Sequence, residues 1–175
     1  MKTMTYNFYD TSSLLLKANT LFETPEEQII ISSITLKELE EIKTMYNKTS
    51  DIKYAARRTL AQLAAHPGCY DVVIFQNNML EPILDKDLLI SNDTKILASA
   101  IWYDNTQHPD ETKFITNDLS LYHMANLFFG TDSIGMVEED IDDEYVGYKV
   151  IKMTEEEMGE FYSHLDFNKY DLYIN

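Results

Sequence analysis

The stretch "TYNFYDTSSLLL", residues 5–16, places a carboxylate and three hydroxyls between two apolar runs. The first run predicts a short buried strand over 5–10, and the second predicts a helix through Leu14–Leu16. Asp10 is therefore expected where a strand ends and a helix begins. Asp is a favourable helix cap at such a position, so capping alone could explain it.

The same alternation of strand and helix continues along the chain. Further strands are predicted over 28–33, 69–76 and 113–118, and helices over 34–46, 51–66, 92–104 and 119–129. Regular alternation of this kind is typical of a layered α/β fold. We expect a three-layer architecture with a central, mostly parallel sheet flanked by helices.

Charge divides the chain unevenly. The 175 residues are 45% hydrophobic and suit one compact domain, with or without an appendage. Residues 1–131 contain 17 acids and 11 bases, a net charge of −6, whereas 132–175 contain 13 acids and 3 bases, a net charge of −10. We expect a domain core over 1–131. The acidic extension over 132–175, with an edge strand at 147–153 and a capped helix from Thr154, would pack on the core or lead to a downstream domain.

Several classes of protein are disfavoured. No apolar run reaches 18 residues, and the N-terminus lacks the pattern of a signal peptide, so we expect no membrane span and a cytoplasmic location. Cys69 is the only cysteine, which excludes a disulfide framework and suits a reducing compartment; we expect it to be a small buried residue. The four His lack zinc-ligand spacing, and none of the five Gly forms a phosphate loop.

A net charge of −16 opposes sequence-independent binding to a polyanion. A role on nucleic acid would need a local basic patch, and one candidate lies between residues 43 and 58, where Asp51 is the only acid. Its five cations are Lys43, Lys48, Lys53, Arg57 and Arg58. A solvated helix face is the alternative interpretation.

Two acids are expected at the same edge of the sheet. Asp10 and Asp118 each follow a predicted strand and have hydroxyl or amide neighbours. Ligands of open α/β sheets bind beyond the carboxyl ends of the strands. Each acid could be only a helix cap, but two at equivalent positions favour a site.

Helical phase selects a third acid. With Ile96 set at 0°, Asp93 falls at about 60°, between Ala100 at about 40° and Leu97 at about 100°. A carboxylate in the middle of an apolar stripe needs a cation, a cluster of donors or a wet cleft, since burying an unpaired charge is costly.

The same analysis selects Glu38. With Leu39 at 0°, Glu38 falls at about 260°, between Met45 at about 240° and Ile42 at about 300°. Neighbouring acids on this helix fall outside the apolar stripe. If Glu38 converges with the three Asp residues, the repulsion would be relieved by a hard divalent cation, Mg²⁺ or Mn²⁺, which can activate water against a phosphodiester.

These four acids, in the strings "FYDTS", "ITLKELEEIK", "SNDTKILASAI" and "FITNDLSL", resemble the PIN domain family. The resemblance covers roughly residues 5–150 and is nearest to PIN domains fused upstream of PhoH-type ATPases. It implies a metal-dependent ribonuclease whose acidic quartet is Asp10, Glu38, Asp93 and Asp118. Ser12, Thr116 and Asn117 would be the flanking polar residues of the first and last motifs. Basic residues usual after the last Asp of that branch are replaced here by Tyr122-His123-Met124.

We therefore expect cleavage of single-stranded RNA, with Lys53, Arg57 and Arg58 guiding the phosphate backbone. One alternative is a catalytically weak module that binds RNA or regulates a fused PhoH-type ATPase. Another is the toxin of a toxin–antitoxin pair. A phosphatase with Asp10 as nucleophile is disfavoured, because the second acid it needs is replaced by Ser12. Self-association is common among such folds, so a homo-oligomer is also possible.

Overall fold

The computed structural model describes residues 3–137. The strands are β1 (Thr5–Tyr9), β2 (Glu27–Ser32), β3 (Tyr70–Val73), β4 (Thr112–Ile115) and β5 (Ile134–Gly135). The α-helices are α1 (Thr11–Leu16), α2 (Ser33–Thr44), α3 (Ser50–Ala65), α4 (Glu81–Asp85), α5 (Asn92–Thr106) and α6 (Leu119–Ala125). Two short 3₁₀ helices, η1 (Asn77–Leu80) and η2 (Thr131–Ser133), complete the described part.

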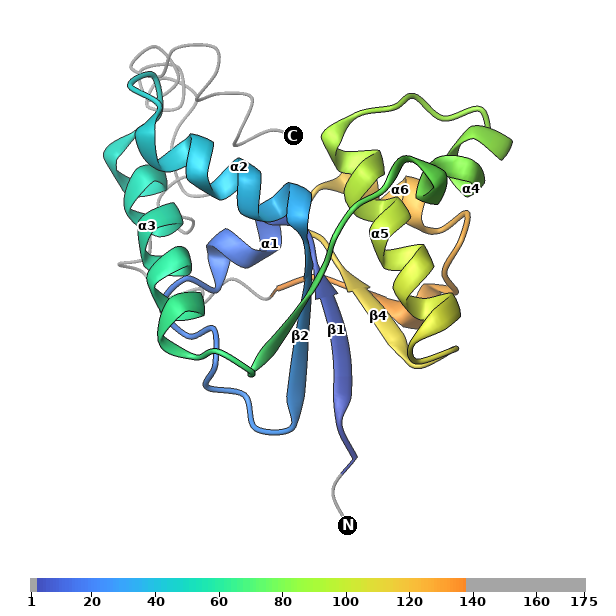
Figure 1. Cartoon of the computed structure of the whole chain (residues 1–175), viewed down its shortest axis with the longest axis horizontal. Helices are drawn as coiled ribbons and strands as arrows, with labels where there is room; N and C mark the ends of the chain where they lie inside the picture. Colours follow the sequence, from blue (N-terminus) through green and yellow to red (C-terminus); the bar gives the residue numbers. More distant parts are fainter. Residues whose placement is uncertain (1–2, 138–175) are drawn as a thin grey trace, which may run out of the picture.

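The five strands form one sheet in the order β3-β2-β1-β4-β5, and all four pairings among residues 3–137 are parallel. Figure 1 shows β1, β2 and β4 side by side, with α1, α2 and α3 on one side and α4, α5 and α6 on the other. The predicted α/β class and three-layer architecture are confirmed. Because every strand points the same way, the carboxyl ends of β1 and β4 lie at one edge, where Tyr9 pairs with Ile115.

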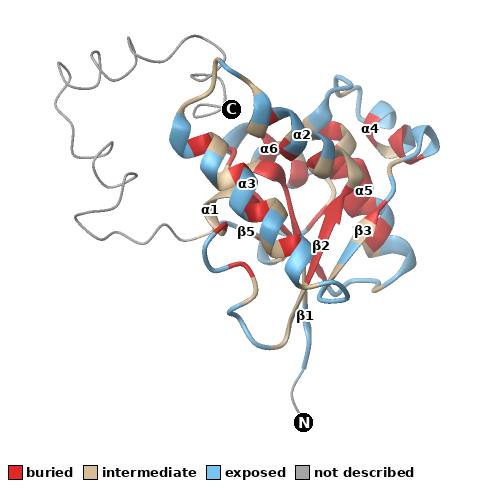
Figure 2. Ribbon diagram, turned by 60° about the vertical axis from the view of Figure 1, so that its left-hand side comes forward, coloured by how far each residue is buried: buried red, intermediate tan, exposed pale blue. Residues whose placement is uncertain are grey.

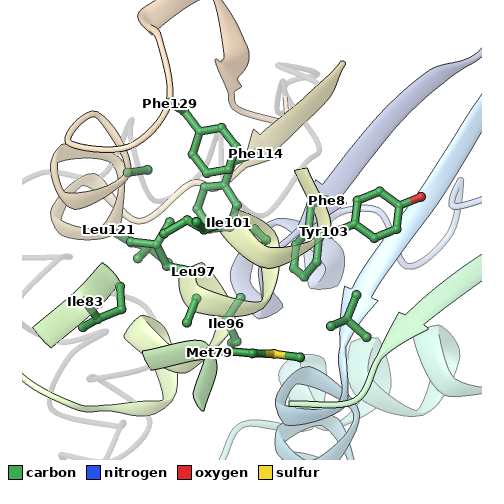
Figure 3. Packing of buried hydrophobic residues seen from close by; sticks show 14 of the residues in the cluster. Phe8, Met79, Ile83, Ile96, Leu97, Ile101, Tyr103, Phe114, Leu121 and Phe129 are labelled. Atoms are coloured by element: carbon green, nitrogen blue, oxygen red, sulfur yellow. The ribbon is translucent and has the colours of Figure 1, made fainter. Parts of the chain in front are cut away.

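One face of the sheet packs against α5 and α6. Phe8, Ile30 and Phe114 point to this face and are fully buried. The rings of Phe8 and Phe114 lie 6.2 Å apart, and that of Phe129 stacks 6.0 Å from Phe114 (Figure 3). The opposite face buries Ile29 and Ile31 against the first three helices. The buried stripe of α3 faces inward, while its outer surface is exposed (Figure 2).

Most predicted elements are confirmed, with different bounds. The strand predicted over 69–76 ends at Val73, because the chain leaves the sheet and the Phe75 N–H donates to Ser33 Oγ at 2.9 Å. The strand predicted over 113–118 ends at Ile115, three residues before Asp118. The helix predicted over 119–129 ends at Ala125.

Four short elements, η1, α4, η2 and β5, were missing from the sequence-based prediction. The first two follow each other directly and share a buried side in Met79, Leu80 and Ile83. Pro82 lies in the first helical turn, where its missing N–H is not needed. Each element is too short for a periodic pattern to reveal it.

The sheet continues past residue 131, the position after which the sequence becomes strongly acidic. β5 pairs with β4, and the Thr116 N–H donates to the Gly135 carbonyl at 3.0 Å. The acidic run, edge strand and capped helix expected over 138–175 lie outside the described residues.

Cys69 is exposed, so the expectation of a buried cysteine was wrong. It lies in the turn between α3 and β3, where it packs into neither face of the sheet. Among residues 3–137, no helix is long and apolar enough to cross a membrane.

Candidate active site

Asp10 lies at the carboxyl end of β1 and caps α1. Its side chain is 3% exposed and accepts hydrogen bonds from the Ser13 N–H at 2.9 Å and from Ser13 Oγ at 2.6 Å. Ser12 Oγ donates to the two carboxylate oxygens at 3.0 and 2.9 Å. Burial raises the pKa of Asp10, and the hydroxyl and amide donors oppose that rise. Capping is thus one function of Asp10, and its second oxygen is turned toward β4.

Thr116 connects Asp10 to the next strand of the sheet. This residue is fully buried directly after β4, and its Oγ1 donates to Asp10 Oδ2 at 2.5 Å. The same hydroxyl oxygen accepts from the Asp118 N–H at 3.1 Å. One side chain therefore joins the two Asp residues at adjacent strand ends.

Asp118 caps α6 as Asp10 caps α1. It is 7% exposed, and its Oδ1 accepts from the N–H groups of Ser120 at 2.9 Å and Leu121 at 3.3 Å. No hydrogen bond to its Oδ2 is formed within residues 3–137, so this oxygen is available to a ligand.

Glu38 lies on α2, and its carboxylate contacts the first residue of α1. Thr11 Oγ1 donates to Glu38 Oε1 at 2.6 Å, and Asn92 Nδ2 lies 3.5 Å from Oε2. Burial raises the pKa of Glu38, these donors lower it, and the charges of Asp10 and Glu41 raise it further. The carboxylate is half-buried and oriented by residues from α1 and α5.

Asp93 lies in the first turn of α5 and is the fourth carboxylate of the candidate site. Burial raises its pKa to about 7, with further contributions from the charges of Asp118, Glu38 and Asp10, in that order. The three other acids thus lie close enough to repel it. No Lys or Arg of residues 3–137 is among the charged groups that shift the pKa of Asp10, Glu38 or Asp93.

The remaining predicted residues differ in their surroundings. Asn117 exchanges two hydrogen bonds with the Val137 backbone, at 3.0 and 2.9 Å, and thereby holds the chain after β5 rather than an acid. Lys53 is half-buried on α3, and Arg57 and Arg58 are exposed there; no carboxylate of residues 3–137 forms a salt bridge with them. The structure does not bring these cations to the four acids.

The donor set suits a hard divalent cation. Four carboxylates that repel one another, without a cation of the described chain between them, provide oxygen ligands and the negative charge that such an ion requires. Within residues 3–137, however, no three His, Cys, Asp or Glu side chains are grouped closely enough to hold one ion. Mg²⁺ usually keeps several waters and takes only one or two protein carboxylates, so the acids fit an ion of this kind that remains partly hydrated.

Thr11, Ser13 and Asn92 contribute hydrogen bonds that motif analysis did not assign to the acids. Thr11 follows Asp10 directly in the sequence, but its hydroxyl donates to Glu38 and orients that carboxylate. The only sequence signal was a hydroxyl or amide beside Asp10, Asp93 and Asp118, and Glu38 has none next to it. Such a signal does not identify the partner, because Thr11 and Glu38 are 27 positions apart and Asn92 and Glu38 are 54 apart.

We predict that Thr11→Val slows the RNA cleavage proposed below by about 10-fold, since removing a group that orients a metal ligand typically costs 10- to 100-fold. Without its donor the Glu38 carboxylate is less favoured in ionised form, so the acidic limb of the pH–rate profile should move to higher pH. Thr112→Val is the matched control, because the buried Thr112 Oγ1 has no hydrogen-bond partner in the described structure. Equal rates and profiles for Thr11→Val and wild type would exclude this positioning.

The fold and the acids at its strand ends define an α/β protein with a carboxylate site at the edge of a parallel sheet. The family model described as "PIN domain" matches residues 8–128, and the chain belongs to this family. Membership supports a nuclease function.

The solved structures similar to the chain include the following two. One is a member of the VapBC family of toxin-antitoxin systems, VapBC-5, from Mycobacterium tuberculosis; the match has a TM-score of 0.47 and 18% identity and covers 76% of this chain and 98% of that one. The other is the PIN domain of RRP44 from T. brucei, with a TM-score of 0.44, 14% identity, and coverage of 77% of this chain and 76% of that one. No curated protein sequence matches the chain.

Proposed function

We propose that this protein is a divalent-metal-dependent endoribonuclease that cleaves single-stranded RNA. The observation that carries the proposal is the convergence of four carboxylates from separate elements. The pKa of Asp93 reflects it, because the charges of the other three acids, together with burial, raise that pKa to about 7. A protein accepts such repulsion most readily where a bound cation offsets it.

Asp10 and Asp118 would hold Mg²⁺ or Mn²⁺ directly, and Glu38 and Asp93 directly or through water. The bound ion would supply Lewis-acid polarisation of the phosphodiester and stabilise the leaving oxygen. In the chain itself, Ser12, Ser13 and Thr116 keep the Asp10 carboxylate in place. Glu38 and Asp93 have raised pKa values, which suits them to accept a proton from the attacking water.

Metal removal tests the proposal. An unstructured RNA should be cut by the protein with Mg²⁺ or Mn²⁺, be left intact after EDTA treatment, and be cut again when the metal is restored. The measurement is the rate at which a 5′-labelled oligonucleotide shortens on a denaturing gel. Cleavage that persists in EDTA would contradict the metal requirement.

Melting temperature and cleavage measured together distinguish a nuclease from a module that binds metal without cutting RNA. Metal at 100 times its Kd stabilises the folded state by about 2.7 kcal/mol whether or not the site cuts. Stabilisation by Mn²⁺ without cleavage of any RNA would favour a binding role over catalysis.

Further predictions concern the cations of α3, residues 132–175, the location of the protein and its partners. Lys53, Arg57 and Arg58 would guide the phosphate backbone, because none of them forms a salt bridge within residues 3–137 and the two arginines are exposed on α3. Residues 132–175 would form an extension of the core, and cytoplasmic location rests on the lone cysteine.

A PhoH-type partner is supported only by the likeness of sequence strings, and the gene beyond Asn175 would test it. Self-association would appear as a multiple of the monomer mass in solution, and a toxin role as growth inhibition on expression.

A further inference from the structure

We infer that a shallow hollow between α2 and α3 binds one nucleotide of a single-stranded RNA outside the cleavage site. The hollow has a volume of about 270 Å³ and is lined by Lys43, Thr44, Arg57 and Leu60. We call it the α2–α3 hollow. The inference deepens the proposed function and rests on it, since it supposes that RNA is the substrate.

The hollow combines the chemical groups that a nucleotide needs. Leu60 gives an apolar wall, and Arg57 a planar guanidinium that can pair with a phosphate or stack on a base. The Thr44 hydroxyl donates to the Glu41 carbonyl at 3.2 Å, so it can only accept a hydrogen bond from a ligand. Lys43 forms a salt bridge with Glu40 at 2.7 Å, so its charge is partly compensated. Arg57 is the exposed cation of the hollow that no carboxylate of residues 3–137 pairs with.

Two exposed tyrosines lie between the lining residues Thr44 and Arg57 in the sequence. Tyr46, two residues past Thr44, is 92% exposed, and Tyr54, one turn before Arg57 on the outer face of α3, is 54% exposed. Figure 2 shows this outer surface of α3 as largely exposed. Aromatic side chains beside cations are the usual platform for unpaired bases, because each base can stack on a ring while its phosphate pairs with a cation.

Charge favours RNA over a protein partner at this surface. The sequence is strongly acidic, yet α3 contains a single acid, Asp51, and three cations that form no salt bridge within residues 3–137: Lys53, Arg57 and Arg58. A polyanion with unpaired bases complements both the cations and the two tyrosines. A duplex complements only the cations, because its bases are already stacked.

The position also suits a strand that continues from the acids. Thr44 is six residues beyond Glu38 on α2, which corresponds to about 9 Å along a helix axis that rises 1.5 Å per residue. A strand cut near the four acids could therefore reach the hollow within a few nucleotides, at a place where binding does not require metal.

The test is binding of a fluorescein-labelled 12-nucleotide oligo(A) in EDTA, measured by fluorescence anisotropy with the full chain. Tyr46→Ala and Tyr54→Ala should each weaken binding about 5-fold or more, and Tyr46→Phe should keep wild-type affinity, because the ring rather than the hydroxyl stacks. Arg57→Gln should lower the slope of log K against log salt by about 0.7 if one phosphate contact is lost.

Lys113→Gln is the control for charge, since Lys113 is exposed on β4 and belongs to neither helix. A 12-base-pair RNA duplex is the control for stacking, because the tyrosine variants should leave its affinity unchanged. Unchanged oligo(A) affinity in the Tyr46→Ala/Tyr54→Ala double variant would overturn the inference. Equal weakening by Lys113→Gln and Arg57→Gln would do so too.

The outcomes separate this inference from the proposed function. Binding that depends on the hollow, without cleavage when Mn²⁺ is added, would retain the hollow and reject the nuclease. Metal-dependent cleavage with no effect of the hollow variants on affinity or KM would retain the nuclease and reject the hollow.

Discussion

Asp10→Asn is expected to cut an unstructured RNA at least about 100-fold more slowly than wild type, a barrier increase of about 3 kcal/mol. Asp10 is buried and accepts hydrogen bonds from Ser13 of α1 and from Thr116, directly after β4, and neutralising it removes the proposed metal ligand and its charge. The measurement is the single-turnover rate at saturating Mn²⁺, which separates chemistry from RNA binding.

The fold should survive this substitution. Asn caps helices nearly as well as Asp, and the Ser13 N–H can still donate to its side-chain oxygen. Burial disfavours the Asp10 charge, so its removal offsets a weakened bond to Thr116. Asp85→Asn is the matched control, since Asp85 is exposed at the end of α4. Asp10→Asn that melts like wild type and cleaves at the wild-type rate would reject the mechanism. Relief of growth inhibition by Asp10→Asn would support a toxin role.

The metal-free protein is expected to lose stability as pH rises from about 4 to 7. Asp10, Glu38 and Asp93 have raised pKa values in the folded state, so each binds its proton more tightly there than in the unfolded chain. Stability from such a group is fully present below its unfolded pKa and is lost as pH rises through its folded pKa. For Asp93 this window runs from 3.8 to about 7.

Asp93→Asn should flatten this pH dependence and raise the stability of the metal-free protein at pH 8. We expect a gain of about 1–2 kcal/mol after allowance for solvent screening of a half-buried side chain, or roughly 3–6 °C in melting temperature. Melting in EDTA at pH 5, 6, 7 and 8 measures it. The control is Asp85→Asn, which should follow wild type.

Divalent metal should reverse this trend, because the ion binds the ionised carboxylates and its affinity rises with pH. With Mn²⁺ present, wild type should be stabilised more at pH 8 than at pH 5, and Asp93→Asn should gain less. A metal-free protein that becomes more stable between pH 5 and 8 would show that the acids do not repel one another as described.

The apolar pattern of the sequence was sufficient to predict the layered fold, because a strand or helix with one apolar face must bury it. "TYNFY" and "QIIIS" are local patterns, and the strands they predict pair in parallel at the centre of the sheet. Short elements such as η1, α4 and β5 have no periodicity to detect, and only packing defines them.

Position and helical phase also selected Asp10, Glu38, Asp93 and Asp118, since a carboxylate at a strand end or on an apolar stripe is a local anomaly. Their hydrogen-bond partners were decided only by the tertiary structure. Thr116 reaches Asp10 from 106 residues away, and no local rule assigns a buried hydroxyl to one acid rather than another. The raised pKa of Asp93 has the same origin, because desolvation and repulsion exist only once separate elements meet at the edge of the sheet.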